Sequence, residues 1–380
     1  MGATAWGVNV LGMYSWARSF VATFPPGYFA LVMASGIVSV GLSLEGFQVA
    51  SRVLLALAVF AHLVFSALTA WRFVSFRAQM VADMHDPRRA FGFFTFVAGT
   101  NVIGVRLATE SPVTALILLA VSAPVGILLG YAVPWVSVLG RAKRPIIAAA
   151  NGTWFTWVVA SQSVAVLAAA IEPRFAALQQ LLAMVSVMAW SVGVILYASA
   201  AMLVVLRLMW YPVTPLQLNP PYWVSMGAMA ITVVAGAKII EMDSTPMVDS
   251  VRGLIAGLVV VFWCFATWLI PVLIAAGVWR HLVHRIPFRY DANFWSMVFP
   301  LGMYAVAGIY LGRANTLPIV EQVGHAWLWV AVVAWLFTAG SMAAKLLSTS
   351  LRREALGLAV RRVPGPLVRQ PNRRATYSTS

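Results

Sequence analysis

Ten long apolar runs limit this chain to a fold that spans a membrane. A helix needs about 20 apolar residues to cross roughly 30 Å of hydrocarbon. Hydrophobic residues make up 61% and charged residues 10% of the 380-residue chain, whereas charged residues are about a quarter of an ordinary soluble domain. We expect spans near 26–44, 51–75, 89–109, 112–134, 145–170, 176–209, 221–240, 250–278, 292–312 and 323–347.

The placement of basic residues predicts the orientation of these spans. With ten spans, both termini lie on one side, and that side holds 20 of the 26 Lys and Arg residues but only four of the eleven acidic residues. Because basic residues near helix ends stay in the cytoplasm, we predict cytoplasmic termini and a location in the cell membrane (plasma or inner). The net charge of +15 then reflects topology, and we expect no binding of nucleic acid.

The two ends of the chain differ from the ten-helix region at 25–348. Residues 1–24 contain no uninterrupted apolar stretch of the kind that a signal peptide needs, so we interpret them as a cytoplasmic or interfacial segment. Residues 349–380 mix Arg, Pro and Ser. We predict that they form a basic, disordered cytoplasmic tail that contacts anionic membrane lipid.

A thirteen-residue pattern recurs in the odd-numbered spans. Its rows start at Tyr28, Phe93, Trp154, Tyr222 and Phe294, and read YFALVMASGIVSV, FFTFVAGTNVIGV, WFTWVVASQSVAV, YWVSMGAMAITVV and FWSMVFPLGMYAV. Each row opens on an aromatic pair, which we call the dyad, and successive rows are 65, 61, 68 and 72 residues apart. Each repeat is therefore one helical hairpin. Residues typical of helix starts precede the dyads: Pro25, Asp86-Pro87, Pro145, Asn219-Pro220 and Asp291.

The odd spans carry polar and small residues at mid-membrane, whereas the even spans are bulky and apolar. A polar side chain at that depth costs several kcal/mol unless it faces a neighbouring helix or water. We therefore predict an all-α fold of five hairpins in a pseudo-fivefold arrangement, with the odd helices inside around a central pore and the even helices outside. Helix packing with a solid axis is the alternative. The predicted lining is Ser35, Gly99, Thr100, Asn101, Ser161, Gln162, Thr232 and Pro300.

Three stretches, PPGYFALVMASGIVSV, DPRRAFGFFTFVAGTNVIGV and FWSMVFPLGMYAVAGIY, resemble the tellurite-resistance/C4-dicarboxylate transporter family, which is related to the plant slow anion channels. The similarity covers residues 24 to about 347. It implies ten helices in five hairpins around a pore in each protomer, and assembly into a homotrimer. It also implies transport of small anions, such as inorganic anions, tellurite- or sulfite-like oxyanions, or C4-dicarboxylates.

The same resemblance implies a gate. In the family a phenylalanine of the ninth helix closes the pore at mid-membrane, and the FPL sequence of this chain assigns that role to Phe299. The matching residues of the other rows are Met33, Ala98, Val159 and Gly227. A core residue without a gating role is the alternative for Phe299.

Two further points concern the mouth of the pore and the mechanism. Arg106 and Lys238 are candidates for attracting anions at the outer mouth, or equally for anchoring helix ends by snorkelling. A proton-coupled C4-dicarboxylate (malate) carrier is the alternative to a channel. Such a carrier needs a titratable group, and the odd spans hold none at mid-membrane, although Glu110 or Glu241 could serve nearer the ends.

Nothing in the sequence indicates an enzyme. The single cysteine, Cys264, forms no pattern with the five histidines, of which only His281 and His284 share a helical spacing. We therefore expect no metal and no cofactor, and we find no phosphate loop or dinucleotide-binding motif. A receptor or scaffold without transport activity is a third possibility.

Overall fold

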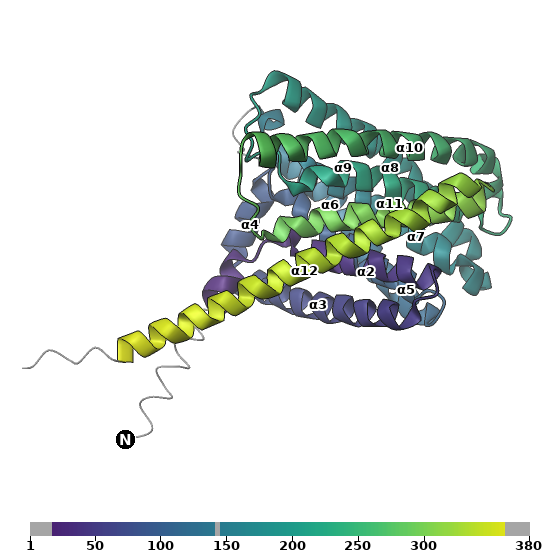
Figure 1. Ribbon diagram of the computed structural model, residues 1–380. Helices are drawn as coiled ribbons and strands as arrows, with labels where there is room; N and C mark the ends of the chain where they lie inside the picture. Colours follow the sequence, from purple (N-terminus) through teal and green to yellow (C-terminus); the bar gives the residue numbers. More distant parts are fainter. Residues whose placement is uncertain (1–16, 141–144, 362–380) are drawn as a thin grey trace, which may run out of the picture. The chain divides into compact units, whose positions relative to one another are not determined.

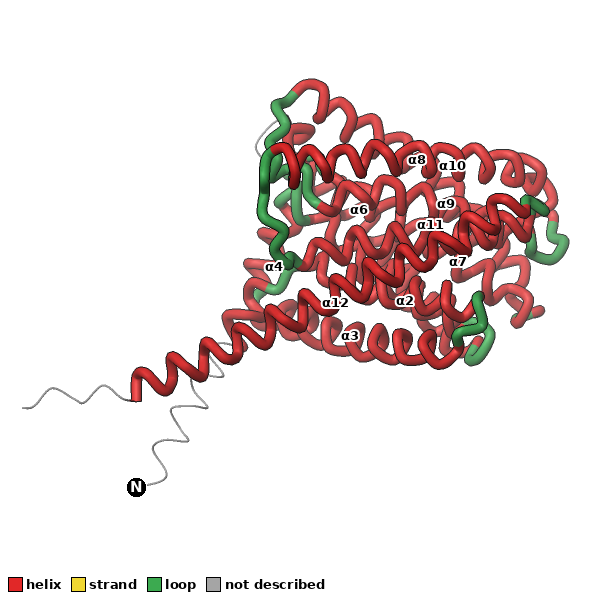
Figure 2. The backbone as a smooth tube through the Cα atoms, in the orientation of Figure 1, coloured by secondary structure: helices red, strands yellow, loops and turns green. Residues whose placement is uncertain are grey.

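The computed structural model of the protein describes residues 17–140 and 145–361, and within these residues the only regular structure is helix. The described residues up to Thr338 form one compact unit and those from Ala339 on form a second. Among the described residues, ten helices are long and apolar enough to cross a membrane. Figure 2 shows how short loops join these helices. The ten predicted spans are therefore confirmed, most of them to within a few residues.

The spanning helices alternate with short connections in the order that the hairpin repeat predicts. The odd-numbered spans contain α2 (Ala30–Leu44), α5 (Phe94–Leu107), α7 (Phe155–Ile171), α9 (Val224–Ile240) and α11 (Trp295–Ala314). The even-numbered spans are α3 (Gln48–Ser75), α6 (Pro112–Leu139), α8 (Gln179–Trp210), α10 (Pro246–Val278) and α12 (Pro318–Arg361). A short helix that was not predicted, α4 (Arg77–His85), follows α3.

Each odd-numbered span begins with a 3₁₀ turn at its dyad. These turns are η1 (Pro26–Phe29), η2 (Ala90–Phe93), η4 (Gly152–Trp154), η7 (Pro220–Trp223) and η9 (Ala292–Phe294). The predicted start at Asp291 is confirmed, because its side chain accepts a hydrogen bond from the Asn293 backbone N–H at 2.8 Å. In the third repeat this role belongs to Asn151, which accepts from Thr153. Pro145, the predicted residue, instead precedes a separate 3₁₀ turn, η3 (Ile146–Ala149).

The odd helices form a closed inner ring. Each contacts the next in the order α2, α5, α7, α9, α11, and α11 contacts α2. In the most apolar stretch of each span, 72–83% of the residues of the odd spans are buried, against 11–28% in the even spans. The odd helices are therefore the inner helices and the even ones the outer helices, as predicted. A strict fivefold relation among the hairpins stays a prediction.

The outer helices lie over the joints of the inner ring. Thus α3 contacts α2 and α5, α6 contacts α5 and α7, α8 contacts α7 and α9, and α10 contacts α9 and α11. The first part of α12 completes this pattern, because Gly324 lies against Gly308 of α11 and Leu328 lies over Gly41 of α2. Residues 350–361 extend α12 past the predicted tail boundary at 349, and residues 362–380 lie outside the described residues.

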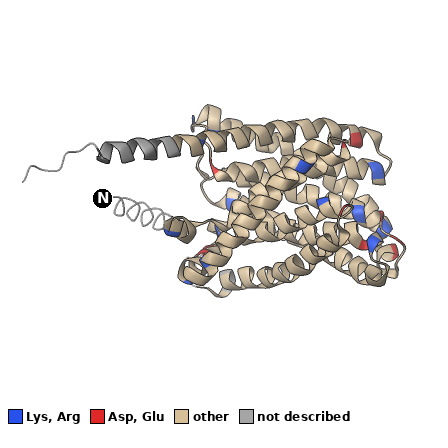
Figure 3. Cartoon of the chain, turned by 90° about the horizontal axis from the view of Figure 1, so that it is seen from below, with Lys and Arg blue, Asp and Glu red and all other residues tan. Residues whose placement is uncertain are grey.

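Charged residues are most frequent toward the two ends of the helices (Figure 3). At the end where the inner helices begin, three arginines at the ends of outer helices bind the neighbouring loops. Arg72 donates to the carbonyls of Ala22 and Phe24 and pairs with Asp83 at 2.7 Å. Arg207 and Arg280 both bind the loop before α9, through Gln217 Oε1 at 2.8 Å and the Leu218 carbonyl at 2.7 Å respectively.

The contact between α11 and α12 has no room for a side chain at its closest point. A Cβ built on Gly324 would lie 2.6 Å from the backbone nitrogen of Ile309 and 2.7 Å from the carbonyl oxygen of Ala305. These are backbone atoms, which cannot move aside without shifting a helix. We predict that Gly324→Ala lowers the free energy of unfolding by about 1–3 kcal/mol. Thermal denaturation in detergent measures this change.

Gly257→Ala in α10 is the matched control, because a Cβ there would meet nothing within 4 Å. Alanine forms helices better than glycine does, so the melting temperature of Gly257→Ala should equal or slightly exceed that of the wild type. Equal melting temperatures for Gly324→Ala and Gly257→Ala would contradict the close packing of α11 on α12.

Candidate functional site

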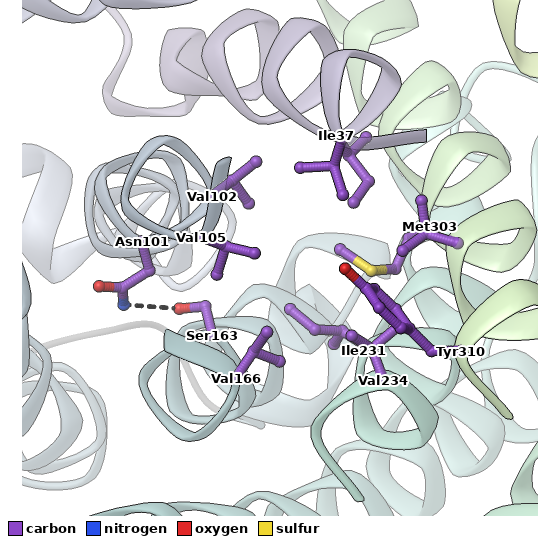
Figure 4. A pocket seen from close by; sticks show the side chains of 12 residues that line it. Ile37, Asn101, Val102, Val105, Ser163, Val166, Ile231, Val234, Met303 and Tyr310 are labelled. Atoms are coloured by element: carbon purple, nitrogen blue, oxygen red, sulfur yellow. Dashed lines mark hydrogen bonds between the residues drawn. The ribbon is translucent and has the colours of Figure 1, made fainter. Parts of the chain in front are cut away.

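A small cavity lies where the five inner helices meet. Its volume is about 20 Å³, which leaves room for about one water molecule. Nine of its twelve lining residues are aliphatic or methionine, and none is charged. The lining residues surround the cavity in Figure 4 and are Ile37, Val40, Asn101, Val102, Val105, Ser163, Val166, Ile231, Val234, Met303, Val306 and Tyr310.

Ten of these residues occupy two positions of the sequence repeat. The residue nine places after the start of each row lines the cavity in every inner helix; we call this the mixed ring (Ile37, Val102, Ser163, Ile231 and Met303). The residue twelve places after the start also does so; we call this the valine ring (Val40, Val105, Val166, Val234 and Val306). The repeat register that was found in the sequence is therefore also a register in space.

Phe299 precedes the mixed ring by one helical turn. It lies four residues before Met303 and seven before Val306, and a spacing of four and seven places residues on one face of a helix. Phe299 therefore belongs to the stripe of α11 that faces the axis, and its side chain is only 1% exposed. The next residue of α11, Pro300, packs against α9, because a Cβ on Gly227 of α9 would lie 2.8 Å from Pro300 Cγ.

Four of the predicted lining residues bind outer helices instead of facing the cavity. Trp335 of α12 donates its indole N–H to Ser35 Oγ at 3.0 Å. Ser161 Oγ and Gln162 Nε2 donate to the carbonyls of Ala189 and Trp190 of α8, at 2.8 and 3.1 Å. Thr100 donates to the Phe96 carbonyl of its own helix and lies 3.5 Å from His62 of α3.

The other four also serve contacts between helices. Asn101 touches the edge of the cavity, but in Figure 4 its amide points away from it, and its Nδ2 donates to Ser163 Oγ at 2.9 Å. Its Oδ1 accepts from Ser122 of α6. The Thr232 hydroxyl donates to the Ala228 carbonyl of its own helix, and the Thr232 carbonyl accepts from the Trp190 indole of α8 at 3.1 Å. A Cβ on Gly99 would meet Val32 of α2 at 3.2 Å, and Pro300 packs against Gly227 of α9. Of the eight predicted lining residues, Asn101 lines this cavity, and the polar groups of the others find partners in neighbouring helices or in their own helix. The lining of an open path stays a prediction.

The two basic residues predicted at the mouth differ in position. Lys238 Nζ lies 4.0 Å from the ring centroid of Tyr310, which lines the cavity, and 2.8 Å from Glu241. Lys238 is therefore near the end of the axis. Arg106 is buried toward α3, where it donates to Ser51 Oγ at 2.9 Å and pairs with Glu110 at 3.0 Å. This geometry is that of a helix anchor.

Sequence reasoning missed the valine ring, although the signal was available. The last column of the five aligned rows reads valine in every row. That column follows the Phe299 column by seven residues, so it had to share a helix face with Phe299. A search for polar residues overlooked this apolar column.

Comparison with known proteins places the chain in a family. The family model described as voltage-dependent anion channel matches residues 23–343, most of the chain. The protein belongs to the voltage-dependent anion channel family. The resemblance drawn from the sequence motifs is thereby confirmed, and the membership supports anion transport across a membrane as the general function of this protein.

Several proteins of other organisms are similar in sequence to this chain over part or most of their length. An uncharacterized membrane protein of Mycobacterium tuberculosis is 54% identical over 154 residues, which are 40% of this chain and 78% of the relative. Two uncharacterized transporters of Methanocaldococcus jannaschii are each 21% identical over 84% of this chain, and the matches cover 94% and 92% of their lengths.

Ser161 provides a test of which face of the inner helices meets the axis. We predict that Ser161→Ala costs about 0.5–1.5 kcal/mol of stability, the contribution of one hydrogen bond, and leaves anion flux unchanged, because its hydroxyl binds Ala189 of α8. Flux into proteoliposomes and melting in detergent measure the two effects. A large change in flux with an unchanged melting temperature would mean that Ser161 meets the permeating ion.

Proposed function

We propose that the protein conducts small anions along the axis of the inner ring, through one path within each protomer, with Phe299 as the constriction at mid-membrane. The observation that carries this proposal is the cavity itself, which takes the same two repeat positions from all five inner helices. A repeat that converges on an axis is the arrangement expected of a pore, and membership in an anion channel family agrees with it.

The electrostatics of the axis favour anions. None of the cavity-lining residues carries a negative charge, so no fixed charge of the lining repels an anion. The five inner helices begin at the same end of the ring, and helix N-termini carry partial positive charge. Lys238, beside Tyr310 at the opposite end, would raise the local anion concentration there.

Pro300 gives α11 a means of moving Phe299. Proline has no backbone N–H, so the carbonyl of Ser296, four residues earlier, lacks its helical partner, and the helix bends more easily at this point. A small change in the bend would turn the Phe299 ring from the axis. Phe299 thus acts as a steric gate on a helix that bends easily at Pro300, where one backbone hydrogen bond is missing.

Several finer features of the proposal come from the sequence. We propose cytoplasmic termini, a cell-membrane location, a homotrimer, and a C-terminal segment that meets anionic lipid. Inorganic anions, tellurite- or sulfite-like oxyanions and C4-dicarboxylates are the candidate substrates. Hydration and size would separate them in a narrow path.

A proton-coupled C4-dicarboxylate carrier is the second candidate, and one observation favours it. Glu172, near the end of the third inner span, is only 1% exposed, so the described residues do include a buried acid of the kind that a proton-coupled carrier needs. Reversal potentials in liposomes separate the two functions. A carrier's potential would shift with a pH gradient and lose this shift in Glu172→Gln, whereas that of a channel would follow the anion gradient alone.

Phe299→Ala tests the gate. Removing the ring should raise anion conductance of the purified protein by on the order of tenfold or more, since a steric block is relieved at the narrow point. Planar-bilayer recording with a panel of anions measures the change. Leu301→Ala is the matched control, because Leu301 is a buried residue of the same helix that lies two residues, or about 200°, around it from Phe299 and therefore on the opposite face. Equal conductance of wild type and Phe299→Ala would remove Phe299 from the gate.

Lys238→Gln tests the mouth. We expect this change to lower anion flux severalfold at about 0.01 M salt and to have little effect at about 1 M, where the Debye length is about 3 Å. Arg52→Gln is the control, because Arg52 is exposed near the start of outer helix α3. If the two variants showed the same salt dependence, the charge of Lys238 would have no special role at the axis.

A further inference from the structure

The valine ring is a second feature of the axis that the Phe299 gate does not explain. Its five members come one from each inner helix, and Val40, Val166, Val234 and Val306 are all 4% exposed or less. Seven residues separate Val306 from Phe299 along α11. At 1.5 Å per residue, the ring lies about 10 Å beyond the phenylalanine.

The valine ring offers an ion no replacement for its water, although Asn101 and Tyr310 also line the cavity beside it. Valine side chains have no polar atoms, and the mixed ring next to them contributes a single hydroxyl, that of Ser163. That hydroxyl is already engaged, because it donates to the Ala160 carbonyl at 2.7 Å and accepts from Asn101 at 2.9 Å. An anion that entered here would lose hydration without gaining a hydrogen bond, which is strongly unfavourable.

The size of the cavity leads to the same conclusion. A space of about 20 Å³ holds about one water molecule, and an apolar cavity of this kind stays dry. Narrow hydrophobic constrictions close membrane pores by excluding water, without any side chain that plugs the path. The valine ring therefore has the chemistry and the dimensions of such a constriction.

We propose that the valine ring is a second barrier, in series with Phe299, which excludes water from the axis and limits the current that remains when the phenylalanine is removed. This inference rests on the proposed function, since it assumes that the axis is the conducting path. It adds a specific consequence: full conductance requires both that Phe299 leave the axis and that the five inner helices separate at the level of the valines.

Threonine substitutions test the ring with little change in shape. Threonine replaces one methyl group of valine by a hydroxyl, which wets the site and gives the ion a hydrogen-bonding partner. We would compare Phe299→Ala with the triple variant Phe299→Ala/Val166→Thr/Val234→Thr in planar bilayers with chloride on both sides. The triple variant should conduct on the order of tenfold more than Phe299→Ala. With Phe299 intact, Val166→Thr/Val234→Thr should conduct as little as the wild type.

Val233→Thr in the Phe299→Ala background is the matched control. Val233 is the neighbour of Val234, is fully buried, and does not line the cavity. The conductance of Phe299→Ala/Val233→Thr should therefore equal that of Phe299→Ala. A second variant covers the case in which the threonines disturb folding: Phe299→Ala/Val234→Leu keeps the site apolar and narrows it, and should abolish the current of Phe299→Ala.

The outcomes separate the two proposals. If Phe299→Ala conducts and neither the threonine nor the leucine changes alter its current, the valine ring is no barrier and the proposed function stands. If folded Phe299→Ala and the folded triple variant both fail to conduct any anion, the axis is not a conducting path and both proposals fail. An increase from Val233→Thr in the Phe299→Ala background as large as that of the triple variant would overturn the assignment of the axial face.

Discussion

The absence of water from the membrane core determines how the inner helices are turned. A polar group in hydrocarbon must find its partner inside the protein, and here the outer helices supply the partners. Ser35 binds Trp335, Ser161 binds Ala189, and the Trp190 indole donates to the Thr232 carbonyl. Each such bond fixes the rotation of an inner helix about its own axis. The polar faces thereby turn outward, and an aliphatic face is left for the centre of the ring.

Because the polar faces of the inner helices turn outward and the aliphatic faces turn inward, a chain with polar residues in its inner spans can have an apolar axis. The polar residues bind the inner helices to their neighbours. The residues nine and twelve places after the start of each row meet at the centre of the inner ring, as the mixed ring and the valine ring. Such an axis is tight at rest, which is what a channel that opens on a stimulus requires. Conduction along it, as we propose, depends on movement of Phe299 and on separation of the inner helices.

The fold was more predictable than the site because they depend on different signals. The ten spans follow from length and hydropathy, and the five hairpins follow from dyads that recur in register with a 3₁₀ turn at each. The cap of the third repeat was misplaced at Pro145, since a second 3₁₀ turn separates that proline from the helix. The helix α4 was missed because its residues, RAQMVADMH, carry no membrane-spanning signal.

Seven of the eight predicted lining residues lie away from the cavity, because polarity alone does not tell which neighbour a residue faces. Thr100 and Val102 are two residues apart, which is about 200° around a helix, so one turns toward α3 and the other toward the axis. No pattern in the sequence indicates that Ser161 has a carbonyl partner in α8. The residues four and seven places after the Phe299 position of each row form the mixed ring and the valine ring. Following that spacing in the sequence would have identified the axial face.

Single-cysteine labelling tests the central claim, that the aliphatic face of the inner helices surrounds the ion path. Cys264 is the one cysteine of the chain and is exposed on an outer helix, so Cys264→Ser gives a thiol-free background. In Phe299→Ala channels on this background, a small methanethiosulfonate reagent should block the current of Val234→Cys and leave those of Val233→Cys and Ser161→Cys unchanged. Block of Ser161→Cys with no block of Val234→Cys would contradict the account.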